Sequence, residues 1–158
     1  MMDDLTAFEQ WASTLLARLS PAGRRNVMRD VARALRQAQK ARIAAQRNPD
    51  GTAYAPRKAR TSAPRLRNKR GRIKRTMFAK LRTARLMRTE VNEHELAVGF
   101  VGRASRIARV HQFGEREQVA PRGPYHHYPA RRLLGLTNAD QRLIRERLLA
   151  YVCESLNA

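Results

Sequence analysis

Apolar side chains recur at helical spacing through the first 46 residues of the chain. Over residues 4–19 they are separated by three, four and seven positions, which predicts an amphipathic helix. Ser20 and Pro21 suit the N-cap and the first turn of a second helix, which we expect to end near residue 46. Its apolar stripe is narrow and rich in alanine, as expected of a helix that packs closely along a neighbour. We predict a helical N-terminal arm over residues 1–47.

Four positions on the apolar side of this arm are candidates for packing or for an oligomer interface. Two lie on each predicted helix: Leu15, Leu19, Val31 and Leu35. The pattern favours an intrachain hairpin of the two helices. It leaves open an arm that packs on a second subunit.

The pattern changes to short β-rich runs between residues 89 and 101. Residues 89–91 and 95–101 flank Asn92-Glu93-His94, which predicts a β-hairpin. The second run carries Val98 and Phe100, two further candidates for packing or an interface. Residues 124–128 are a candidate third strand of the same sheet.

Helical spacing returns after Gly102 and stops at Gly114, which occupies the position of a left-handed helix end. The face of this helix that we expect to be buried consists of Ala104, Ile107, Ala108 and His111. We expect His111 to be a hydrogen-bonded packing residue rather than a general base. Phe113 is expected to be buried under the C-terminal helix.

The C-terminal helix begins with a capping-box pattern, Thr137 followed three positions later by Asp140. Its predicted buried stripe is Ile144, Leu148, Tyr151 and Val152. A shorter helix is predicted over residues 76–86. The fold class is therefore α+β, with an N-terminal helical hairpin, a small antiparallel β-sheet and a C-terminal helix packed on the sheet. We expect a single domain over residues 1–158, with its α+β core at residues 76–158.

The charge of the chain is strongly positive: 33 Lys and Arg against 13 Asp and Glu give a formal net charge of +20. Such a chain is attracted to anionic surfaces. Residues 51–89 contain no acidic residue, and prolines and a glycine interrupt the first part of this stretch. We predict a basic flexible loop over residues 48–75, mobile until a partner orders it. Its partner-facing or DNA-facing cations are Arg57, Lys58, Arg60, Arg65, Arg67, Lys69, Arg70, Arg72, Lys74 and Arg75.

Three interpretations of this basic loop remain open. The favoured one is contact with a protein partner close to DNA. The second is a dedicated basic nucleic-acid-binding protein, although the sequence has none of the usual nucleic-acid-binding signatures. The third is a solvated loop.

Candidate catalytic chemistry is weak throughout the chain. The neighbouring residues His126 and His127 point to opposite faces of an extended chain, and no cysteine or carboxylate cluster lies at zinc-ligand spacing. Glu115 and Glu117 lie among arginines, as ion-pair partners would. We therefore expect no catalytic residues, no metal, no cofactor and no enzymatic activity. The single cysteine, the acidic N-terminus and the absence of a long apolar window predict no disulfide, no signal peptide and no membrane segment.

Three stretches of the chain resemble the virion morphogenesis, or tail completion, family of tailed phages, in the version of contractile-tailed phages of the Mu type. The first is Ala108-Arg109-Val110-His111-Gln112-Phe113-Gly114-Glu115, and the second, after a proline-rich gap, is Tyr128-Pro129-Ala130-Arg131-Arg132-Leu133-Leu134-Gly135-Leu136. Residues 46–58, which include the turn Asn48-Pro49-Asp50-Gly51, are the third. The likeness covers roughly residues 30–155. The stretch 57–88 is more basic than the family pattern.

The resemblance implies a structural virion protein that completes or terminates the tail at its head-proximal end, where head and tail join. It also implies a homo-oligomeric ring, commonly sixfold, that contacts tail tube, sheath or connector proteins and lets DNA pass through its lumen. The expected location is the tail or neck of a virion assembled in the host cytoplasm. A basic nucleic-acid-binding protein is the alternative.

Overall fold

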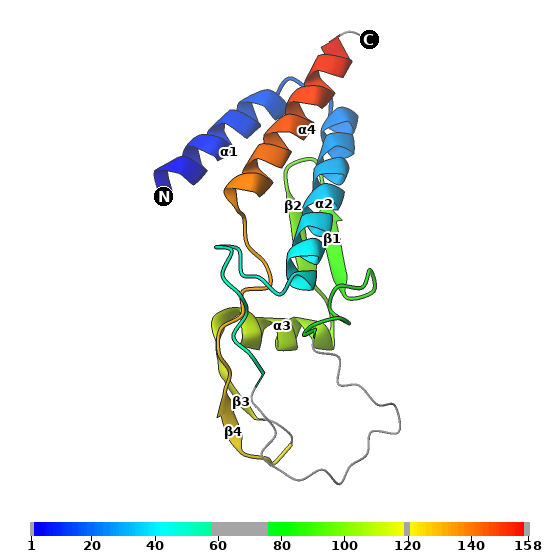
Figure 1. Ribbon diagram of the computed structural model, residues 1–158. Coiled ribbons are helices and arrows are strands. Elements are labelled where there is room, and N and C mark those ends of the chain that lie inside the picture. Colours follow the sequence, from blue (N-terminus) through cyan, green and yellow to red (C-terminus); the bar gives the residue numbers. More distant parts are fainter. Residues whose placement is uncertain (1, 58–75, 119–120, 157–158) are drawn as a thin grey trace.

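The computed structural model describes residues 2–57, 76–118 and 121–156, which form an elongated α+β fold (Figure 1). The elements of this described part are α1 (Met2–Leu16), α2 (Pro21–Ala44), β1 (Met87–Val91), β2 (Leu96–Phe100), α3 (Arg103–Phe113), β3 (Arg116–Gln118), β4 (Tyr125–His127) and α4 (Asn138–Leu156). In the view of Figure 1, α1, α2 and α4 form the upper part, with the β1–β2 hairpin beside α2. Helix α3 crosses below them, and the β3–β4 hairpin projects downwards from its end.

Helix α2 is the central element of the upper part. Ser20 is its N-cap and accepts a 3.1 Å hydrogen bond from the Gly23 N–H, and Pro21 follows as the sequence predicted. One apolar cluster, the upper cluster, joins α2 to α4 and consists of Val27, Met28, Val31, Leu35 and Leu148. Half-buried side chains of α1, such as Trp11, and of β2, such as Leu96, pack against it. The helical N-terminal arm is thus part of the core of the folded subunit.

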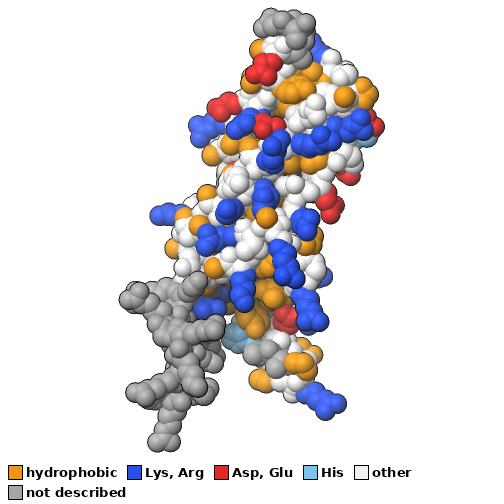
Figure 2. Space-filling model, turned by 90° about the vertical axis from the view of Figure 1, so that its right-hand side faces the viewer, with side chains coloured by type: hydrophobic (Ala, Val, Ile, Leu, Met, Phe, Trp, Pro, Cys, Tyr) orange, Lys and Arg blue, Asp and Glu red, His pale blue; other side chains and the backbone are white. Residues whose placement is uncertain are grey.

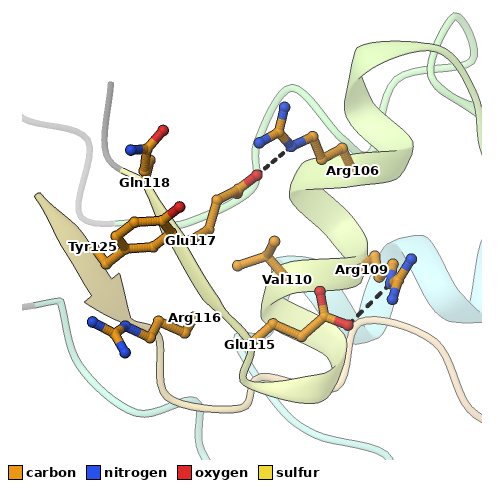
Figure 3. A pocket seen from close by; sticks show the side chains of 8 residues that line it. All are labelled: Arg106, Arg109, Val110, Glu115, Arg116, Glu117, Gln118 and Tyr125. Atoms are coloured by element: carbon orange, nitrogen blue, oxygen red, sulfur yellow. Dashed lines mark hydrogen bonds and ion pairs between the residues drawn. The ribbon is translucent and has the colours of Figure 1, made fainter. Parts of the chain in front are cut away.

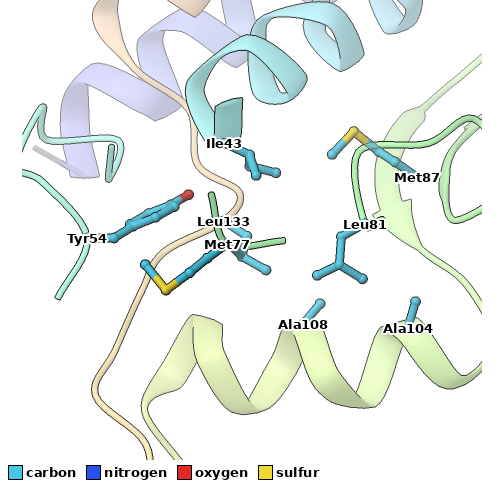
Figure 4. Close-up of a cluster of buried hydrophobic side chains, with 8 residues drawn as sticks. All are labelled: Ile43, Tyr54, Met77, Leu81, Met87, Ala104, Ala108 and Leu133. Carbon is cyan, nitrogen blue, oxygen red and sulfur yellow. The ribbon is translucent and has the colours of Figure 1, made fainter. Parts of the chain in front are cut away.

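A second apolar cluster, the lower cluster, lies where the lower end of α2 meets α3 (Figure 4). Its side chains converge from helices, a strand and two loops: Ile43, Tyr54, Met77, Leu81, Met87, Ala104, Ala108 and Leu133. Ala104 and Ala108 let α3 approach the others closely, because their side chains are small. This cluster draws together segments that are up to ninety residues apart in the chain.

Two small antiparallel sheets appear in the described residues. Strands β1 and β2 pair from Met87–Phe100 to Val91–Leu96, and the Asn92 side chain accepts hydrogen bonds from the next turn residues, so the predicted hairpin is confirmed. Strands β3 and β4 form a separate sheet. Residues 124–128 therefore do contain a strand, but its partner is β3 and not the β1–β2 hairpin.

The predicted helix ends are confirmed at two places. Gly114 adopts the left-handed conformation (φ 68°, ψ 45°) that ends α3. Thr137 and Asp140 form a reciprocal capping box before α4: the Thr137 N–H donates to Asp140 Oδ2 at 2.9 Å, and the Asp140 N–H donates to Thr137 Oγ1 at 3.1 Å. Arg42 also donates to this carboxylate, at 2.5 Å, and so ties the start of α4 to α2.

The prediction of a helix over residues 76–86 is wrong. This stretch forms successive turns, and Phe78 has a positive φ of 63°, which a right-handed helix does not allow. Gln46 fixes the stretch instead, because its side chain accepts from the Met77 N–H at 2.8 Å and donates to the Met77 carbonyl at 3.0 Å. Tertiary contacts override the helical spacing of the apolar residues here.

Two expectations about α3 are also wrong. Ile107 is 50% exposed and Phe113 is 69% exposed, so neither lies in the core and Phe113 is not under α4. Helix α3 buries Ala104, Ala108 and Val110, and α4 packs along α2 and α1 well above it (Figure 1). The buried stripe of α4 agrees better with the sequence, since Leu148 and Val152 are buried and Ile144 and Tyr151 are half-buried.

Candidate functional site

A buried arginine binds the backbone just before Arg57, the residue at which the basic stretch (residues 57–75) begins. Arg131 is 4% exposed, and its guanidinium donates to the carbonyls of Ala55 at 2.7 Å and Pro56 at 2.9 Å. Its backbone N–H donates to the His111 carbonyl at 2.6 Å. Burial, followed by the charge of Arg57, lowers the pKa of Arg131 from its usual value. Carbonyl oxygens rather than a carboxylate satisfy this cation, so it acts as a clamp on the chain just before Arg57.

His111 completes the clamp from α3. Its Nδ1 atom lies 3.2 Å from Nη1 of Arg131, and because the guanidinium only donates, Nδ1 is the acceptor. The ring packs edge-on against Phe78 and Tyr128, with centroids 4.8 and 5.1 Å away. Burial, and then the charges of Arg131 and Arg57, lower the pKa of His111 to about 4. His111 is therefore neutral at pH 7 and serves as a hydrogen-bonded packing residue.

Three stretches of sequence meet at this place, which we call the junction: residues 46–57, 108–115 and 128–136. Besides Arg131, the Asn48 side chain accepts from the Arg132 N–H at 2.8 Å. The Oε1 atom of the Gln112 side chain accepts from the N–H groups of Leu133 and Leu134, at 2.7 and 3.0 Å. Gly135 lies so close to Pro49 that an added Cβ would be 2.5 Å from the proline Cγ. The stretches that carry the family resemblance are thus the ones that pack together.

The junction positions both ends of the basic stretch. Its first end, through Arg57, leaves from the Arg131 clamp, and its second end arrives at Met77, which Gln46 holds. The remaining members of the predicted basic loop lie outside the described residues: Lys58, Arg60, Arg65, Arg67, Lys69, Arg70, Arg72, Lys74 and Arg75. Arg57 is exposed. The described residues on either side of the stretch, Arg57 and Met77, lie at the same end of the subunit as α3.

An open, polar concavity of about 400 Å³ lies between α3 and the β3–β4 hairpin (Figure 3). Glu115 pairs with Arg109 at 3.0 Å, and Glu117 pairs with Arg106, as the sequence predicted for both acids. The Arg116 guanidinium lies 5.1 Å from the ring centre of Tyr125. Every charged side chain that lines the concavity thus has a partner of its own, and the acids show none of the pairing that acid–base catalysis uses.

The eight candidates for packing or an oligomer interface have different environments. Val31 and Leu35 are buried in the upper cluster, and Leu15, Leu19 and Val98 are half-buried against it. Phe100 packs at the edge of the lower cluster, and His111 belongs to the clamp. Phe113 alone among these eight is exposed.

Sequence reasoning missed the clamp residue Arg131 and the two glutamines Gln46 and Gln112. Each forms hydrogen bonds from its side chain to distant backbone groups, and such bonds have no periodicity that a sequence pattern reveals. The family motifs around residues 112 and 131 were the available signal. Among the described residues no group of three or more His, Cys, Asp or Glu side chains is arranged to hold a metal ion. No helix of the described part is long and apolar enough to cross a membrane.

The junction is built from side chains that bind distant backbone groups and so join the family-like stretches. The model of the phage virion morphogenesis family matches residues 3–153, and the chain belongs to this family. It is 41% identical to tail completion protein S of Escherichia phage P2 over 152 aligned residues. The aligned residues make up 96% of this chain and 99% of that protein. A comparison with solved structures gives no match. The chain has a structural role in completing a phage tail.

Proposed function

We propose that this chain terminates the tail at its head-proximal end, where head and tail join, and that it acts there as a homo-oligomeric ring of six subunits. The observation that carries the proposal is the 41% identity to a tail completion protein over 99% of that protein's length. The two chains align over nearly their whole lengths, so the alignment leaves out no large domain of either chain that would change how its subunits assemble. The chain would assemble in the host cytoplasm and remain in the tail or neck of the virion.

The surface of the subunit supports an assembled state. Among the described residues both sheets have two strands, so each strand lacks a strand neighbour on one side, where a strand of the next subunit could pair. Large apolar side chains are exposed at the α3 end, where Phe113 is 69% and Tyr125 is 60% exposed. Exposed aromatic side chains of this size are typical anchors of protein interfaces. We propose that the α3 end contacts the next subunit or a tail tube, sheath or connector protein.

The basic stretch would face the interior of the ring or an acidic partner. The described residues on either side of it, Arg57 and Met77, lie at the junction near α3, on the side of the proposed interface. In an open ring the cations of the stretch would lie close to the DNA that passes through the lumen. Replacing Arg65, Arg67, Lys69, Arg70 and Arg72 with Ser would leave the junction unchanged. It should permit ring formation and block a later step, with unjoined heads and tails in electron micrographs of infected cells.

The ring itself is tested with Phe113→Ser and with the matched control Leu149→Ser. Leu149 is 47% exposed on α4, far from α3 in Figure 1. Sedimentation velocity and negative-stain images of the wild type should show six copies of the 18.1 kDa chain. Phe113→Ser should give a folded monomer that fails to complement a phage lacking the gene, and Leu149→Ser should behave as wild type. A wild type that stays monomeric with its tail partners present contradicts the ring, and a Phe113→Ser variant that assembles normally contradicts the interface.

A further inference from the structure

Helix α2 carries a stripe of positive charge along its exposed side. The members follow at intervals of four, four, three and four positions, so they share one face of the helix: Arg25, Arg29, Arg33, Arg36 and Lys40. They span about 22 Å of helix at 1.5 Å per residue. Figure 2 shows the side of the molecule on which α2 and β1 lie, with Lys and Arg side chains from its upper to its lower part. We call this set the α2 stripe.

The members of the α2 stripe differ from two other helix arginines, Arg42 and Arg147, in having no acidic partner. Arg42, on the same helix, pairs with Asp140, and Arg147 of α4 pairs with Asp30 at 2.8 Å. Within the described residues, no member of the α2 stripe forms an ion pair. Like charges four positions apart destabilise a helix. The stripe therefore costs the subunit stability, and an external anion would relieve that cost.

One member of the stripe fixes its orientation. Arg36 is half-buried, and its Nε donates to the Met87 carbonyl of β1 at 2.9 Å. This bond, together with the packing of α2 on the β1–β2 hairpin, holds the helix against the sheet. Arg25, Arg29, Arg33 and Lys40 are exposed. The four charges are thus carried on a rigid element rather than on a loop.

The chemistry of the stripe suits a phosphate backbone better than a protein surface. A protein interface has an apolar centre from which charged residues are depleted. Here the residues that flank the cations are the exposed Ala22, Asn26 and Gln37 and the half-buried Asp30, whose carboxylate is taken up by Arg147 of α4. None of them is large and apolar. No aromatic residue lies on α2, so unstacked bases of a single strand find no platform there. A straight row of cations separated by about 5–6 Å suits the dense, regular charge of duplex DNA.

We propose that the α2 stripe binds the sugar–phosphate backbone of duplex DNA without regard to base sequence. The inference goes beyond the role in tail completion. It requires neither the ring nor the cations of residues 57–75. Arg25, Arg29 and Arg33 make the phosphate contacts, Lys40 extends them, and Arg36 positions the helix.

The test is the salt dependence of binding to a fluorescent 30-base-pair DNA duplex of arbitrary sequence. The variant Arg25→Gln, Arg29→Gln, Arg33→Gln keeps good helix formers and leaves Arg36 in place. Three lost phosphate contacts should lower the slope of log K against log salt concentration by about 2.7, at roughly 0.9 per contact. Binding at 100 mM salt should weaken at least about tenfold. The thermal midpoint of the variant should equal or exceed that of the wild type, because repulsion along α2 is removed.

The matched control is Arg18→Gln, Arg85→Gln, Arg142→Gln, which removes the same net charge from three exposed residues on different elements. Its salt slope should stay within about one unit of wild type. If the control and the stripe variant lost the same salt slope and the same DNA affinity, net charge alone would explain the effect and the proposal would be overturned. So would an unchanged slope in the stripe variant, or no duplex binding by the wild type at 50 mM salt. A stripe variant that binds DNA normally but sediments as a smaller oligomer would assign α2 to a subunit interface instead.

Discussion

The upper and lower parts of this subunit are stabilised in different ways. In the upper part, regular apolar stripes of α2 and α4 meet in the upper cluster, around Val31 and Leu148. In the lower part, apolar side chains are joined by polar side chains that bind distant backbone, as Arg131 does at Ala55 and Pro56. Apolar packing of the upper kind tolerates substitution by side chains of similar size and polarity. The lower part depends instead on individual hydrogen bonds, each of which one substitution removes. The specific hydrogen bonds therefore lie at the junction, and the helices supply the general stability.

The largest effect is expected from a charge placed in the upper cluster. Leu35→Asp should destabilise the subunit by about 5 kcal/mol or more, because it removes a buried side chain and buries an unpaired carboxylate. That is a large fraction of the stability of a typical domain. Leu5→Asp is the control on α1, where the side chain is 41% exposed, and should cost less than about 1 kcal/mol. Thermal unfolding followed by circular dichroism measures both, and similar losses would mean that α1 belongs to the core as fully as α2.

The two parts also differ in how well the sequence predicts them. The N-cap of α2, the β1–β2 hairpin and the capping box of α4 rest on local patterns of three to five residues, and all three are confirmed. The failures lie in the lower part. Residues 76–86 have helical spacing but are held in turns by Gln46, and Phe113 is exposed although it is a large apolar residue. Local pattern determines an element only where no long-range polar contact competes with it.

The sequence motifs identify the three stretches that form the junction, but they do not predict that these stretches contact one another. The stretches 46–58, 108–115 and 128–136 stand out as family-like, yet nothing in their spacing shows that they touch. The contacts that join them are one-to-one, such as Asn48 with the Arg132 N–H and Gln112 with the Leu133 N–H. Pro49 against Gly135 adds a close approach that only a residue without a side chain allows. Family-specific residues here serve packing geometry rather than chemistry.

An intermediate effect is expected from removal of the clamp. Arg131→Met should cost about 3 kcal/mol, because the carbonyls of Ala55 and Pro56 and the Nδ1 atom of His111 lose their donor. Arg132→Met is the matched control, since it removes the same charge from the adjacent, exposed residue, and should change stability by less than about 0.5 kcal/mol. Urea unfolding gives the two free energies. Hydrogen exchange should show that the loss is concentrated at residues 54–57 and spares α2. An equal loss of exchange protection at residues 54–57 and in α2 would contradict a clamp that acts locally.

The smallest effect is expected from protonation of His111, and it has a defined sign. The pKa of His111 is lowered to about 4 in the folded state, by burial first and then by Arg131 and Arg57, from a usual value of 6.5. Between these values the unfolded chain binds a proton that the folded chain does not, so this contribution to stability is complete above pH 6.5 and falls as the pH drops towards 4. The loss from this residue should be on the order of 1–3 kcal/mol. His111→Gln should be mild at pH 7 and should flatten the stability profile between pH 6.5 and 4, as measured by urea unfolding at each pH. Because the proton acts on the clamp, the loss in the wild type should appear in hydrogen exchange near residues 54–57 before it appears in α2, and a uniform loss across both parts would contradict the division drawn between them.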